Sequence, residues 1–127
     1  MIQAKTLQGF KTEIGNDTHS IVADEPILLG GTNQGLSPFE LLEASLASCS
    51  SITMRMYAER KQWDLQEIEV RTSLIYGMDK KLHSIKKEIF LNGNLSEDQR
   101  QRLNTISSKC PVHKILEKSI EIQSILK

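Results

Sequence analysis

Two cysteines are the residues of this chain whose chemistry could go beyond packing. Cys49 lies in a long stretch without proline or glycine, and Cys110 directly precedes a proline. The proline indicates a helix start, where the helix dipole and unpaired amides stabilise a thiolate. His113, three residues after Cys110, would add a proton acceptor or a positive charge. Each cysteine also has a structural interpretation, as a buried and inert side chain.

A metal site is a further use of these side chains, with Cys49, Cys110 and His113 as ligands. A Cys-x-x-His pair alone supplies too few ligands, and the chain has no second pair at zinc spacing. We therefore expect neither a metal ion nor another bound cofactor.

The composition narrows the classes of partner. Among 127 residues, Lys plus Arg number 16 and Asp plus Glu number 16. The chain has no long basic run of the kind that is typical of nucleic-acid binding proteins. The first residues lack the order of a secretory signal, and no stretch approaches the roughly 18 apolar residues that cross a bilayer. We expect a cytoplasmic protein without membrane attachment, folded as a single domain over residues 1–127.

The elements that must position the thiols begin with short strands and a long helix. Turn signals among residues 1–27 favour two or three antiparallel strands, and a glycine-rich loop follows. Ser37, Pro38 and Glu40 have the types and spacing of an N-cap, a first helical residue and a capping-box partner. They predict a helix that runs to Lys61.

The second half of the chain predicts a hairpin, two helices and a strand. Apolar residues alternate in Leu65–Tyr76 and Leu82–Leu91, as in a two-stranded hairpin. Ser96 and Gln99 form a second capping box, which starts a helix that should end near Cys110. A short helix from Pro111 to Glu117 and a strand over residues 119–125 complete an α+β order.

The long helix places Cys49 at the centre of its apolar face. At about 100° per residue, Leu46, Ile52 and Met56 lie within about 80° of it. Small side chains such as Ala44 and Ala58 lie on the other side and would let a second layer approach. This pattern favours a central helix that is covered on both sides, with Cys49 toward the core.

The stretches GTNQGLSPFELLEASLASCSSITMRMYAERKQWDLQEIEV and SSKCPVHKIL resemble the OsmC-like family, which includes osmotically induced and organic hydroperoxide resistance proteins. The resemblance rests on a loop threonine, a helix-start proline and two cysteines, the second within Cys-Pro-Val: Thr32, Pro38, Cys49, Cys110, Pro111 and Val112. It implies an α+β fold with antiparallel sheets around a long central helix, in an intertwined homodimer. It also implies a thiol peroxidase. The Cys49 thiolate would attack an organic hydroperoxide, and Cys110 would resolve the sulfenic acid as a disulfide that a thiol reductant opens.

The sequence departs from the family at the residues that support the thiolate. Family peroxidases carry an Arg in the N-terminal strand region and a Glu after the helix-start proline, whereas here no Arg precedes Arg55 and Phe39 follows Pro38. Glu40 already has a capping task. The remaining candidates for support are acids, lysines, a histidine and arginines: Glu40, Glu43, Lys5, Lys11, His113, Arg55 and Arg60. The rival function is a non-enzymatic or weakly active protein that binds an apolar or reactive small molecule in the dimer pocket.

Overall fold

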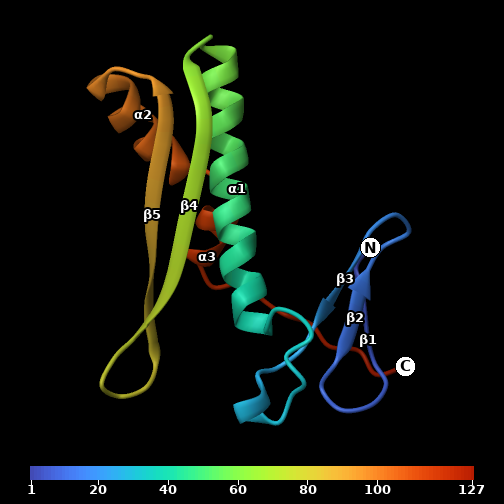
Figure 1. Cartoon of the computed structure of the whole chain (residues 1–127). Coiled ribbons are helices and arrows are strands. Elements are labelled where there is room, and N and C mark those ends of the chain that lie inside the picture. The colour runs from blue at the N-terminus through green and yellow to red at the C-terminus, as the bar shows by residue number, and fades with distance from the viewer. The chain divides into compact units, whose positions relative to one another are not determined.

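The computed structural model describes residues 1–127, which gather in two compact units, Met1–Ala44 and Ser45–Lys127. It has the expected α+β architecture, with antiparallel sheets and one long helix (Figure 1). None of its helices combines the length and apolar character that a membrane span requires.

The first unit contains a three-stranded antiparallel sheet. Its strands are β1 (Gln3–Thr6), β2 (Thr12–Gly15) and β3 (Ser20–Ala23), in the order β1-β2-β3, followed by a short 3-10 helix, η1 (Ile27–Leu29). The expected N-terminal strands are thereby confirmed.

The glycine-rich loop of the first unit folds around the carboxylate of Asp24, which is only 2% exposed. This carboxylate accepts backbone N–H groups of Glu25, Thr32 and Gln34 at 2.8, 3.1 and 3.2 Å, and the Thr32 hydroxyl donates to it as well. At Gly31 a Cβ would lie 1.9 Å from the Glu25 carbonyl oxygen. The loop therefore needs glycine for a close approach to its own backbone.

Helix α1 (Pro38–Arg60) begins as predicted. The Ser37 N–H donates to the Glu40 carboxylate at 2.7 Å, and the Glu40 N–H donates to the Ser37 hydroxyl at 3.3 Å. These two bonds form the expected capping box, because each residue supplies the acceptor that the other's amide lacks.

The second unit contains a long hairpin of β4 (Asp64–Tyr76) and β5 (Leu82–Asn94), as the alternation predicted (Figure 1). Helix α2 (Glu97–Ser107) follows, and Ser96 and Gln99 form its capping box. Helix α3 (Pro111–Leu116) completes the ordered elements, so both predicted helices are confirmed.

The core of the second unit joins α1, α2 and the hairpin. Its buried members are Met54, Ala58, Leu65, Leu103 and Ile106. Buried residues recur every fourth position along α1, in the stripe formed by Leu46, Ser50, Met54 and Ala58.

The prediction that the Cys49-centred face of α1 packs into the core is wrong for the single chain. Cys49 itself is half-buried, and Ile52 and Met56 are 58% and 65% exposed. The reason is that the core forms on the neighbouring stripe, which shares only Leu46 with the Cys49-centred face and leaves Ile52 and Met56 without cover.

The prediction of a strand over residues 119–125 is also wrong. These residues have no regular structure, and Ile120 and Ile122 are exposed. A strand is held by hydrogen bonds to a neighbour, and no strand of this chain pairs with the segment.

Candidate functional site

The two thiols, far apart in the sequence, meet in the second unit. Cys49 extends from α1 and is half-buried, whereas Cys110 is the N-cap of α3 and is fully buried. Both are free, and the Cys49 side chain lies close enough to Cys110 to help lower the pKa of its thiol. The structure thus brings together the two cysteines that the sequence singled out.

The Cys110 sulfur receives hydrogen bonds from several directions. The backbone N–H of His113 donates to it at 3.4 Å, because Cys110 has the extended backbone of an N-cap and Pro111 starts the helix. The hydroxyl of Ser50, from the buried stripe of α1, lies 3.5 Å from the same sulfur. These two groups and the neighbouring Cys49 side chain surround the sulfur.

Lys87 supplies a positive charge beside this cluster. Its Nζ donates to the Ser50 hydroxyl at 3.2 Å and to the Ser107 carbonyl at 2.9 Å. The residue lies on β5 and shares the half-buried face of that strand with Ile85 and Ile89. Our sequence reasoning missed it, although a lysine in phase with the apolar residues of an alternating strand is a detectable signal.

The electrostatics of the cluster favour a thiolate at Cys110. Burial raises the pKa of the Cys110 thiol, but the hydrogen bonds with Ser50 and the His113 amide, the neighbouring Cys49 side chain and the charge of Lys87 oppose it, and the net pKa is lowered. Burial lowers the pKa of the Lys87 ammonium, against the attraction of the two sulfurs.

Three predicted supporting residues lie in the second unit with other partners. The His113 ring pairs with Glu117 at 3.1 Å, so it is the backbone amide of His113 that reaches Cys110. The guanidinium of Arg55 donates to the carbonyls of Leu65 and Gln66, the latter at 2.8 Å, at the start of β4. The guanidinium of Arg60 lies over the ring of Tyr57.

The other predicted supporting residues, Lys5, Lys11, Glu40 and Glu43, belong to the first unit. Glu40 serves the capping box, and the Ser37 amide holds the pKa of its carboxyl below the ordinary value. A role of these four side chains at the thiols stays a prediction. No three His, Cys, Asp or Glu side chains gather in a way that could hold a metal ion.

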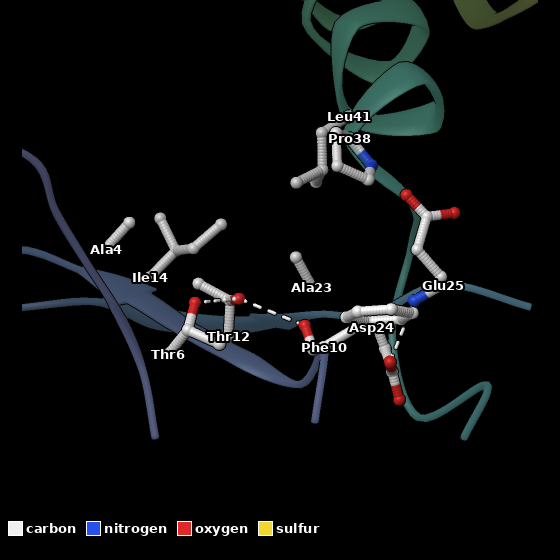
Figure 2. Close-up of a pocket in the computed structure, with 10 residues that line it drawn as sticks. All are labelled: Ala4, Thr6, Phe10, Thr12, Ile14, Ala23, Asp24, Glu25, Pro38 and Leu41. Atoms are coloured by element: carbon white, nitrogen blue, oxygen red, sulfur yellow. Dashed lines mark hydrogen bonds between the residues drawn. The ribbon is translucent and has the colours of Figure 1, made fainter. Parts of the chain in front are cut away.

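A cavity of about 570 Å³ opens within the first unit. Figure 2 shows its mostly apolar wall and the bond between the Thr6 and Thr12 hydroxyls, 2.6 Å long. Its lining comes from the sheet, the loop and the start of α1: Ala4, Thr6, Phe10, Thr12, Ile14, Ala23, Asp24, Glu25, Pro38 and Leu41. The cavity has the size and apolar character of a small-molecule site.

Comparison with known proteins agrees with the fold. The family model described as OsmC-like protein matches residues 31–124. The chain belongs to the OsmC-like family. No curated protein sequence matches it significantly.

Solved structures share the OsmC-like fold of this chain at low sequence identity. An OsmC-like protein from Mycoplasma pneumoniae is 20% identical, with a TM-score of 0.79 over 92% of this chain and 86% of that chain. A protein of Psychrobacter arcticus, linked by name to osmotic stress and detoxification, is 21% identical, with a TM-score of 0.79 over 89% and 85%. The organic hydroperoxide resistance protein OsmC of Legionella pneumophila is 18% identical, with a TM-score of 0.63 over 91% and 87%.

In this OsmC-like chain, the half-buried thiol of Cys49 lies beside the fully buried thiol of Cys110. Donors and a nearby cation around a sulfur are the environment in which a thiolate becomes stable and reactive. The arrangement can therefore support nucleophilic and thiol–disulfide chemistry.

Proposed function

We propose that this protein is a thiol-dependent peroxidase that reduces organic hydroperoxides through Cys49 and Cys110. The observation that carries the proposal is the proximity of two free thiols from separate elements, beside a lysine. The family's hydroperoxide resistance proteins, such as the one from Legionella pneumophila, support it. We include a cytoplasmic location in the proposal, because two free thiols persist in a reducing compartment.

The proposed reaction oxidises the two thiols and reduces the hydroperoxide to an alcohol. The Cys49 thiolate attacks the terminal oxygen, so an S–O bond forms, the O–O bond breaks and the departing alkoxide takes a proton. The Cys110 thiolate then attacks the Cys49 sulfenic acid, and a disulfide forms as hydroxide leaves and is protonated to water. An external dithiol reduces the disulfide and is itself oxidised.

Burial supports this division of roles. Cys49 is the less buried of the two thiols, whereas Cys110 has no exposed surface. A fully buried thiol can contact only groups inside the protein, which suits a resolving cysteine.

The test is consumption of cumene hydroperoxide with a dithiol reductant. We expect Cys49→Ser to abolish turnover. Without the dithiol, Cys110→Ser should consume one equivalent of hydroperoxide and keep a sulfenic acid on Cys49. Ser48→Ala is the matched control, because Ser48 neighbours Cys49 on α1 but is exposed and bonds only to its own helix. Full turnover by Cys49→Ser would refute the proposal.

We also propose that the protein works as a homodimer. The face of α1 that carries Ile52 and Met56 is apolar and uncovered in the single chain, and burying such a patch against a second copy is favourable. Sedimentation should give about twice the chain mass of 14.4 kDa. A monomer at micromolar concentration would contradict this part of the proposal.

A second candidate function is binding of a small apolar molecule, and the cavity of the first unit favours it. Cumyl alcohol, which cannot oxidise a thiol, is a suitable probe for calorimetry. Binding that is lost in Ala4→Phe, which fills the cavity, but kept in Cys49→Ser would support a binding function that is independent of the thiols. Absence of cumyl alcohol binding would contradict this second candidate function.

A further inference from the structure

We propose that Lys87, acting through Ser50, holds Cys110 as a thiolate in the resting protein, and that this thiolate accepts the proton of Cys49. The inference rests on the proposed peroxidase function and deepens it. It assigns a positioning role to Lys87 and a proton-transfer role to Cys110, in addition to its role as resolving thiol.

The directions of the hydrogen bonds carry the first step. An ammonium group has only donors, so the Ser50 oxygen must be the acceptor of its bond with Lys87. The single hydroxyl proton of Ser50 is then free to point at the Cys110 sulfur, 3.5 Å away. The His113 amide can only donate. Two donors and the neighbouring Cys49 side chain thus surround one sulfur, which suits an acceptor without a proton of its own.

The second step is the charge balance of the cluster. Cys110, Ser50 and Ser107 have no exposed surface, and a buried charge is costly unless it is paired and hydrogen-bonded. Lys87 on β5 is the cation that acts on Cys110, and Cys49 on α1 is its titratable neighbour. On α3 the His113 ring is turned to Glu117, and α2 contributes the Ser107 carbonyl, which also accepts from Lys87. The lowered pKa of Cys110 agrees with this balance.

The third step is the path of the proton. The Cys49 thiol gives its proton to the Cys110 thiolate, which makes Cys49 the nucleophile. When the O–O bond breaks, the Cys110 thiol returns this proton to the alkoxide, so the alcohol leaves neutral. Cys110 is again a thiolate when it attacks the sulfenic acid, and solvent protonates the departing hydroxide. Lys87 supplies the positive charge beside the thiols in a chain in which no Arg precedes Arg55.

The experiment is a pH titration of the ultraviolet thiolate absorbance in a Cys49→Ser background. This background leaves Cys110 as the only thiol, and the new hydroxyl can still donate to it. Lys87→Met removes the charge at similar length. Lys86→Met is the matched control, because Lys86 is the adjacent residue on β5, is exposed and pairs with Glu88 at 3.0 Å.

We expect the midpoint of the background protein to lie below the ordinary cysteine value of about 8.5. Lys87→Met should raise it by about one pH unit or more, and Lys86→Met should leave it unchanged. Equal midpoints in the two lysine variants would overturn the inference. If Lys87→Met does not fold, the background protein still decides, since a midpoint at or above about 8.5 overturns the inference as well. A lowered midpoint in a protein that consumes no hydroperoxide would refute the proposed function and leave the thiolate assignment standing.

Discussion

Ser50→Ala is the substitution that isolates the hydroxyl between Lys87 and Cys110. Ser50 is fully buried, and its oxygen lies 3.2 Å from the Lys87 Nζ and 3.5 Å from the Cys110 sulfur. Alanine removes only the oxygen and slightly raises the helix propensity of α1. Lys87 retains the Ser107 carbonyl as an acceptor, so its ammonium still has one protein partner.

The size of the expected effect follows from the lost bond to the sulfur. A hydrogen bond to a charged group contributes about 1.5–3 kcal/mol, and we take the lower value because the contact is long. Since one pKa unit corresponds to about 1.4 kcal/mol, the pKa of Cys110 should rise by about one unit. The resting thiolate near neutral pH then falls by up to about tenfold.

The assay combines the thiolate titration in the Cys49→Ser background with urea unfolding at several pH values. A pKa that is lower in the folded than in the unfolded protein makes stability rise with pH between the two values, because the unfolded chain binds more protons there. Ser50→Ala should reduce this rise, whereas the exposed control Ser48→Ala should not. A midpoint shift of less than about 0.3 unit in a folded variant would refute the reasoning.

Three further outcomes are expected. Asp24→Asn should lower the thermal unfolding midpoint near neutral pH and reduce the loss of stability in acid. The hydrogen bonds led by Thr32 lower the pKa of the Asp24 carboxyl, so its contribution is present above the unfolded pKa and lost as pH falls through the folded one. Met56→Glu should convert a dimer into a species of 14.4 kDa in sedimentation, because it places a charge on the uncovered face of α1. A monothiol added to the oxidised protein should form its mixed disulfide on Cys49, and peptide mapping would locate it. Cys110 is fully buried, and its lowered pKa makes it the better leaving group.

Short-range features of the sequence determined most of the secondary structure. The capping boxes at Ser37 and Ser96 formed as predicted, because their partners lie three residues away on the same helix. The hairpin followed from the alternation of apolar residues, and Pro111 placed Cys110 at a helix start. These interactions join near neighbours in the chain, so residue type and spacing suffice to predict them.

The tertiary structure decided what lies around the thiols and which surfaces stay open. Ser50 and Lys87 are 37 residues apart, and their contact depends on how α1 packs against the hairpin. The buried stripe of α1 depends in the same way on the core at Leu65 and Leu103, so the apolar periodicity alone indicated the wrong face. The residues after α3 had the pattern of a strand, but strand formation requires a partner that no local pattern supplies. The sequence by itself determined the helices, the hairpin and the two cysteines, whereas long-range packing decided which groups set the charge at those cysteines.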